Sequence, residues 1–114
     1  MAAHRDGSRS TEIKVRSATL AIGKIRQVAE SIETEQQDAR LNQNYKAAMQ
    51  ALTPAQQTQL RDAQRLWIKF RDADCALLGS LTGGSIDRIN SASCFLDMTK
   101  QRADGLGRLV EPSL

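Results

Sequence analysis

The architecture of this 114-residue chain can be read outward from residues 53–94, TPAQQTQLRDAQRLWIKFRDADCALLGSLTGGSIDRINSASC. Thr53 is suited to the N-cap of a helix, Pro54 to its first position, and Gln56 to the third position of a capping box. Gly79 is a natural helix end, because glycine readily adopts the conformations that terminate a helix. The stretch therefore predicts a long helix that begins at Pro54 and ends just before Gly79.

A second helix is expected after a glycine-containing loop of residues 80–84. Ser85 is suited to its N-cap, and Asp87 in the first turn faces the positive end of the helix dipole. Both helices carry an apolar stripe in alternating steps of three and four residues. The stripes are Leu60, Ala63, Trp67, Phe70 and Leu77 in the first helix, and Ile89, Ala92, Leu96, Thr99, Ala103, Leu106 and Val110 in the second.

Two further apolar stripes precede this helical pair and do not share a helical phase. They are Ile22, Ile25, Ala29 and Ile32, followed by Leu41, Tyr45, Ala48 and Leu52. One straight helix would place these stripes on different sides, and Thr34 with Gln37 makes a second capping-box pattern. We therefore expect a helix from about Ser17 to Glu33 and another from about Glu35 to Leu52. The predicted fold is all-α, a small antiparallel bundle of three to four helices.

The composition suits one globular domain, with 40% apolar and 25% charged residues. No apolar run is long enough to span a membrane.

Most of the net charge of +3 lies in residues 1–17, which carry four Lys or Arg against two Asp or Glu. We interpret residues 1–17 as a leader fused in place of a removed segment, or as a native disordered arm, and residues 18–114 as a single helical domain. Without the arm no broad basic surface remains, so we expect no nucleic-acid partner.

The two cysteines, Cys75 and Cys94, fall near the end of one predicted helix and about three turns into the next. Antiparallel helices joined by a short loop bring these positions level, so we expect a disulfide between the last two helices. Such a bridge contributes on the order of 3 kcal/mol in the chain-entropy model and implies an oxidising compartment. The alternative is two reduced, buried cysteines in a cytosolic protein. Two cysteines are too few for a structural zinc site, and no CxxC redox motif is present.

No group of polar residues has the pattern of a catalytic site. Asp72 and Asp74 point to different sides of a helix, and no histidine follows His4 to serve as a base. The pair Gly83-Gly84 is too slight for a phosphate loop. A basic i, i+4 stripe, interpreted as a solvated helix face, consists of Arg61, Arg65 and Lys69. We therefore expect no enzymatic activity, cofactor or metal.

Gln64, Trp67 and Arg71 lie on adjoining parts of one helix face. We expect Trp67 to lie in the core and Arg71 to reach a carboxylate on a neighbouring helix, with Asp38 and Asp97 as the candidate partners. The alternative is an exposed Trp–Arg pair, a composition favoured at interface anchors.

The order and spacing of these residues resemble the lysozyme-inhibitor LprI-like family, a group of small secreted or periplasmic bacterial proteins. The matching pieces are Asp38-x-x-Leu41-Asn42-x-x-Tyr45, Leu60-x-x-x-Gln64-x-x-Trp67-x-x-Phe70-Arg71-x-x-x-Cys75, Gly83-Gly84-Ser85-Ile86, Cys94 and Thr99-x-x-Arg102. They cover roughly residues 35–109. Phe70 stands where the family often has tyrosine, and an additional cysteine pair common near the start of the domain is missing. The resemblance implies a structural core motif of Asn42, Tyr45, Gln64, Trp67, Phe70, Arg71 and Arg102, and it includes both cysteines.

The resemblance also implies a function. It predicts a periplasmic or secreted envelope protein that binds and inhibits lysozyme or a related cell-wall hydrolase. A lysozyme cleft holds a protonated acid and an ionised carboxylate, to which hydroxyls or a cation on a rigid loop are complementary. We therefore expect Ser80, Thr82 and Arg71 to contact a protein partner. The alternative is an immunity-type or structural interaction protein of the envelope whose partner is not lysozyme.

Overall fold

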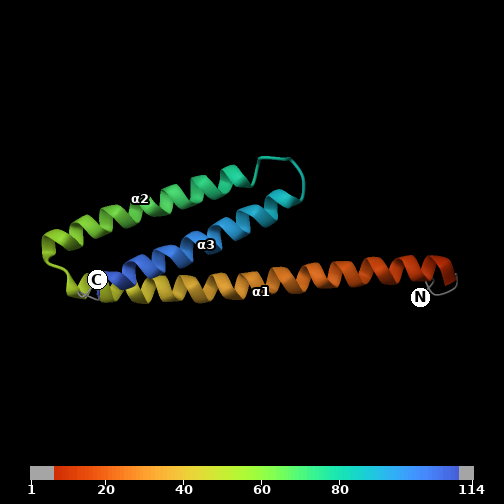
Figure 1. Ribbon diagram of the computed structural model, residues 1–114, viewed down its shortest axis with the longest axis horizontal. Helices are drawn as coiled ribbons and strands as arrows, with labels where there is room; N and C mark the ends of the chain where they lie inside the picture. Colours follow the sequence, from red (N-terminus) through yellow and green to blue (C-terminus); the bar gives the residue numbers. More distant parts are fainter. Residues whose placement is uncertain (1–6, 111–114) are drawn as a thin grey trace. The chain divides into compact units, whose positions relative to one another are not determined.

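The described part of the chain, residues 7–110 of a computed structural model with side chains from residue 23 onward, is all-helical. It contains three helices, α1 (Gly7–Ala51), α2 (Pro54–Leu78) and α3 (Ile86–Arg108) (Figure 1). The predicted all-α fold is confirmed. No helix in this described part is both long and apolar enough to cross a membrane.

The chain divides into two compact units, residues 1–32 and residues 33–114. Within the described residues, the first unit consists of the N-terminal part of α1. The second contains the remainder of α1 together with α2 and α3, and all of the contacts discussed below belong to it. The separation of an arm of residues 1–17 from a domain of residues 18–114 stays a prediction, and residues 1–6 of that arm lie outside the described residues.

α1 is one uninterrupted helix, so the predicted break near Thr34 is wrong, as are the two shorter helices expected on either side of it. The two apolar stripes do not conflict, because only one of them is buried. Ile25 and Ile32 are exposed, whereas Leu41 and Ala48 are buried. No proline or glycine interrupts α1 after residue 23, so nothing in the local sequence forces a kink.

α2 begins and ends as the sequence predicts. The hydroxyl of Thr53 accepts a hydrogen bond from the backbone N–H of Gln56 at 3.3 Å, and the Gln56 side chain accepts one from the N–H of Thr53 at 3.0 Å. This reciprocal pair is a complete capping box, with Pro54 in the first turn. At the other end, the N–H of Gly79 donates to the carbonyl of Cys75 at 3.0 Å.

The core of the second unit combines residues from all three helices. Its buried apolar residues are Leu41, Ala48, Leu60, Ala103 and Leu106, with Tyr45, Met49, Leu52 and Trp67 packed against them. The predicted stripe of α2 is only partly buried, because Phe70 and Leu77 are 60% and 58% exposed while Gln64 and Cys75 are buried. The inward face of α2 therefore lies about one residue further along the helix than predicted, and it includes polar side chains. In α3 the buried part of the predicted stripe lies in the second half of the helix, and Ile89 near its start is exposed.

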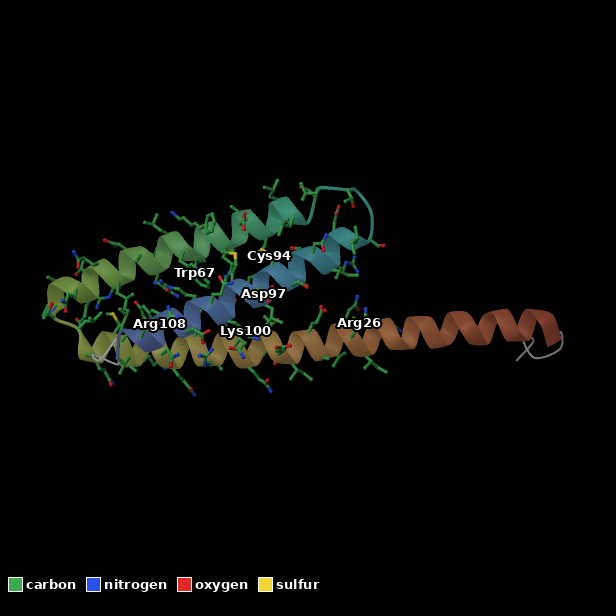
Figure 2. All side chains as sticks on the ribbon, in the orientation of Figure 1. Arg26, Trp67, Cys94, Asp97, Lys100 and Arg108 are labelled. Atoms are coloured by element: carbon green, nitrogen blue, oxygen red, sulfur yellow. A yellow bond between two sulfur atoms is a disulfide. The ribbon has the colours of Figure 1, made fainter. Side chains whose placement is uncertain are left out.

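Two ion pairs also connect the second half of α1 to α3. Lys100, labelled in Figure 2, places its ammonium nitrogen 3.9 Å from a carboxylate oxygen of Glu33. Arg40 forms a hydrogen-bonded ion pair with Asp104. The hydrogen bond from Arg40 holds the pKa of the Asp104 carboxyl below its ordinary value. All four side chains are about half exposed, so each ion pair contributes little to the free energy of unfolding.

Candidate functional site

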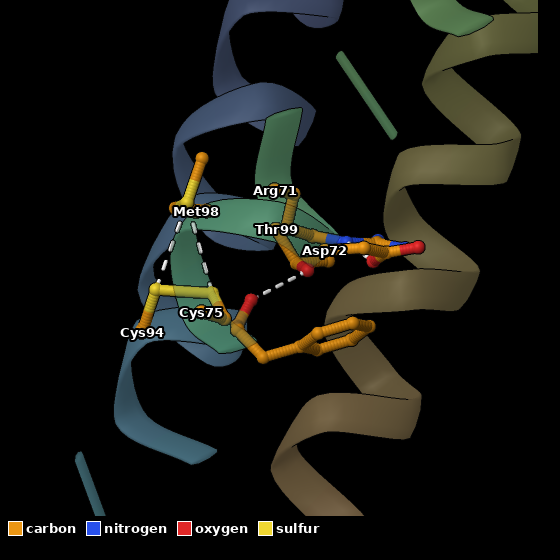
Figure 3. A network of polar contacts seen from close by, with 7 residues as sticks. Arg71, Asp72, Cys75, Cys94, Met98 and Thr99 are labelled. Atoms are coloured by element: carbon orange, nitrogen blue, oxygen red, sulfur yellow. Dashed lines mark hydrogen bonds and ion pairs between the residues drawn. A yellow bond between two sulfur atoms is a disulfide. The ribbon is translucent and has the colours of Figure 1, made fainter. Parts of the chain in front are cut away.

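The α2–α3 hairpin is cross-linked by a disulfide between Cys75 and Cys94, whose Cα atoms are 5.5 Å apart. The predicted pairing is confirmed. Figure 3 shows Met98 beside the bridge, with its sulfur 3.9 Å from the sulfur of Cys75 and 3.8 Å from that of Cys94. The bridge links α2 to α3, the two helices that flank the connecting loop.

The loop itself is organised around the carboxylate of Asp87. This carboxylate accepts hydrogen bonds from the hydroxyl of Thr82 at 2.7 Å, from the N–H of Thr82 at 3.1 Å, and from the N–H of Gly83 at 2.8 Å. The Thr82 hydroxyl in turn accepts from the N–H of Gly84 at 3.1 Å. Gly83 has φ +77°, a left-handed conformation that glycine adopts without steric cost. The loop is therefore a closed hydrogen-bonded structure.

This network changes the roles that the sequence suggested for the loop. Ser85 occupies the predicted N-cap position, but its side chain makes no capping hydrogen bond. The hydroxyl of Ser80 donates to the carbonyl of Leu77 at 2.9 Å, and that of Thr82 is bound to Asp87. Ser80 and Thr82 stay predicted partner contacts, yet both hydroxyls are already used inside the loop. The large apolar side chain of the loop, Leu81, is 61% exposed.

We expect the loop to report the titration of Asp87. The hydrogen bond from Thr82 lowers the pKa of this carboxyl, partly offset by burial, which raises it. Because the folded-state pKa lies below the unfolded value of about 3.9, the resulting stabilisation is complete above that pH and is lost as the pH falls through the folded pKa. In an NMR titration, the amide protons of Thr82 and Gly83 should shift with a midpoint below about pH 3.9. In Asp87→Asn this transition should vanish; a wild-type midpoint at or above the unfolded value would contradict the expectation.

The guanidinium of Arg71, one helical turn before Cys75 on α2, contacts two aromatic rings. The guanidinium carbon of Arg71 is 4.8 Å from the centroid of the Trp67 ring and 4.0 Å from that of Phe95 on α3. Its Nε donates to the carboxylate of Asp72 at 3.0 Å (Figure 3). The Arg71 side chain is only 11% exposed. These contacts place a cation inside the hairpin, where cation–π interactions are strengthened by the loss of solvent.

The partner predicted for Arg71 was wrong. Its ion pair is formed with Asp72 on the same helix, and neither Asp38 nor Asp97 takes that role. Trp67 is partly buried and packs against the core, as expected, so the pair does not form an exposed anchor. Contact of Arg71 with a protein partner stays a prediction. The structure places its side chain between α2 and α3.

A groove of about 290 Å³ lies between α1 and α2. It is lined by Asn42, Tyr45, Arg61, Gln64, Arg65 and Ile68. On its inner side the carbonyl oxygen of the Gln64 side chain accepts a hydrogen bond from Nε of Arg102 at 2.9 Å, and the Arg102 guanidinium lies 6.0 Å from the Trp67 ring centroid. Burial lowers the pKa of Arg102.

Three residues of the predicted core motif, Asn42, Tyr45 and Gln64, line this groove. Gln64 is buried, and Tyr45, Trp67, Arg71 and Arg102 are partly buried. Asn42 and Phe70 are exposed, so their assignment to the core was wrong. Asn42 lines the groove, and Phe70 lies off the inward face of α2. The spacing of Arg61 and Arg65 predicted a solvated helix face. No pattern in the sequence indicated that these arginines lie beside Asn42 and Tyr45.

The family model described as lysozyme inhibitor LprI matches residues 17–106, which include the disulfide, the loop and the groove. The chain belongs to the lysozyme inhibitor LprI family. A relative of this LprI-family chain is an uncharacterized protein of Rhizobium meliloti (strain 1021), with 34% identity over 65% of this chain and 63% of that protein. The chain thus spans less than two thirds of the length of this relative. No solved structure matches the chain.

Proposed function

We propose that this LprI-family chain is a periplasmic or secreted protein that inhibits a lysozyme or a related cell-wall hydrolase by binding it, and that it catalyses no reaction itself. The observation that carries this proposal is the family match over residues 17–106. A disulfide between Cys75 and Cys94 is the second support, because such bridges persist in oxidising compartments and are rare in the cytosol.

The α2–α3 loop is the part of the molecule best suited to enter a hydrolase cleft. Its backbone is fixed by Asp87, and the disulfide links the two helices that flank it, so little conformational entropy is lost when it binds. Leu81 lies within the loop and is exposed, and further exposed apolar side chains precede and follow it. These are Leu77, Ile86 and Ile89. Burying an exposed leucine side chain against a partner contributes about 1.5–3 kcal/mol, so Leu81 on a rigid loop is suited to act as an anchor.

The proposal is tested by measuring lysozyme turnover on a peptidoglycan suspension against increasing concentrations of the protein. We expect Leu81→Asp to raise the concentration needed for half-inhibition at least tenfold, because burying a new carboxylate at an interface costs more than 1.4 kcal/mol. Leu66→Asp is the matched control, since Leu66 is similarly exposed (66%) but lies on α2 outside the loop. It should inhibit as the wild type does.

Two results would contradict this proposal at different levels. Unchanged lysozyme turnover at many-fold molar excess of the wild-type protein would remove lysozyme inhibition. Recovery of a non-muramidase partner from periplasmic extract would then favour the immunity-type alternative. Equal weakening by Leu66→Asp and Leu81→Asp would retain inhibition but remove the loop as its site.

A further inference from the structure

We propose that the groove between α1 and α2 is a second binding site, for the carboxylate of an acidic sugar. The site is lined by Asn42, Tyr45, Arg61, Gln64, Arg65 and Ile68. It is separate from the α2–α3 loop and does not depend on the inhibitory function proposed above.

The charge of the groove favours an anion. Two of its lining residues, Arg61 and Arg65, are cations, and none is acidic. Within residues 23–110, Arg65 has one long ion pair, 3.9 Å to Asp62, between side chains that are largely exposed, and Arg61 has no ion pair. Exposed pairs of this kind are weak, so both guanidinium groups remain free to bind a ligand. Their spacing of four residues places them side by side on α2, where they can share one carboxylate.

The inner side of the groove presents hydrogen-bond donors, because of Arg102. A guanidinium has only N–H groups, so the Gln64 side chain must turn its oxygen toward Arg102, and the two atoms are 2.9 Å apart. Because Gln64 also lines the groove, we infer that its NH₂ group is available to a ligand there. Gln64 is only 9% exposed, so its orientation is fixed by packing as well as by this bond. The Gln64 amide therefore adds uncharged donors to the two cations and offers an anion no competing acceptor.

The remaining lining residues suit a sugar ring. Tyr45 and Ile68 contribute apolar surface, against which the C–H face of a sugar can pack, and the amide of Asn42 can pair with a hydroxyl group. The volume of about 290 Å³ is at the lower end of the range for ligand pockets, which fits a single ring.

A second groove, between α1 and α3, differs because a carboxylate lines it, whereas no acidic residue lines the α1–α2 groove. Its lining includes Arg40, Asp104 and Arg108, and Arg40 and Asp104 pair with each other, so a carboxylate that would repel an anion lies in the groove wall beside the cations. The contrast assigns the acidic ligand to the α1–α2 groove specifically.

The site can be tested by NMR titration of the whole chain with glucuronic acid at constant ionic strength. We expect saturable shifts of the side-chain amide signals of Asn42 and Gln64. Glucose has the same ring without the carboxylate and should bind at least tenfold more weakly. Lactate, a carboxylate without a sugar ring, should also bind at least tenfold more weakly. Equal binding of glucose would overturn the anion site, and equal binding of lactate would overturn its assignment to a sugar.

Variants separate the groove from general surface charge. The double variant Arg61→Ala/Arg65→Ala should weaken glucuronic acid binding at least tenfold. Lys69→Ala is the matched control, because Lys69 continues the same basic stripe but does not line the groove, and it should change binding by less than twofold. Loss of binding in Lys69→Ala, or full binding in the double variant, would overturn the proposal.

Gln64→Glu provides a test that does not depend on losing the fold. The new carboxylate can accept the hydrogen bond from Arg102 as an ion pair, so the melting temperature should not fall. It also replaces the NH₂ donors with a negative charge, so glucuronic acid binding should be lost. A Gln64→Glu protein that melts like the wild type and still binds glucuronic acid would contradict the assignment.

Discussion

Replacing both Cys75 and Cys94 with alanine is expected to lower the free energy of unfolding by about 3 kcal/mol. The bridge joins residues 19 apart in sequence, and without it the unfolded chain regains the conformational freedom that this closed loop removes. For a domain of this size, such a loss corresponds to a fall in melting temperature on the order of 12 °C or more. Urea unfolding followed by circular dichroism measures the change directly.

The wild-type protein treated with reductant is the control for this double variant. Both should unfold at the same urea concentration if the covalent link is responsible, and reductant should not affect the variant. The loop should also lose part of its rigidity, so inhibition measured well below the melting temperature should weaken as well. An unchanged unfolding midpoint in the double variant would show that packing around Met98 holds the hairpin together without the bridge.

The features that could be predicted from the sequence are those that depend on neighbouring residues. The capping box at Thr53 and Gln56 and the helix end at Gly79 are local patterns, and each forms as expected. The Cys75–Cys94 bridge followed from two helices and a short loop, because that arrangement fixes which positions lie opposite each other. A similar pattern at Thr34 failed, because a capping-box sequence within a helix with no proline or glycine nearby does not end it.

Apart from the disulfide, features that depend on contacts between helices could not be predicted. The stripe predicted for α2 was misplaced because it was drawn through apolar residues alone, whereas the inward face of the helix also includes Gln64 and Arg71. In the structure the guanidinium of Arg71 contacts the rings of Trp67 and Phe95, and Gln64 accepts a hydrogen bond from Arg102. The sequence placed Asp87 in the first turn of α3, but its bonds to Thr82 and Gly83 depend on how the loop folds back. The groove likewise needs α1 beside α2.

Arg71→Ala is expected to lower the free energy of unfolding by about 3 kcal/mol, through the loss of cation–π contacts in a desolvated site and the cavity left between the rings. The guanidinium of Arg71 contacts the rings of Trp67 on α2 and Phe95 on α3, so its removal loosens the hairpin next to the disulfide. The ion pair with Asp72 contributes little to this effect, because the Asp72 side chain is 57% exposed. Asp72→Ala should therefore cost less than about 1 kcal/mol.

Two further replacements of Arg71 separate charge from packing, each measured by urea unfolding. Arg71→Met keeps an apolar side chain of similar length without the charge, and Arg71→Lys keeps the charge without the planar group that stacks on both rings. We expect both to be less stable than the wild type and more stable than Arg71→Ala. If Arg71→Met were as stable as the wild type, the stack would be stabilised by packing alone. If Arg71→Ala lowered the free energy of unfolding less than Asp72→Ala does, the packing of the two rings would not depend on the guanidinium. The predicted contact of Arg71 with a protein partner would then be a reason for a buried cation at this position.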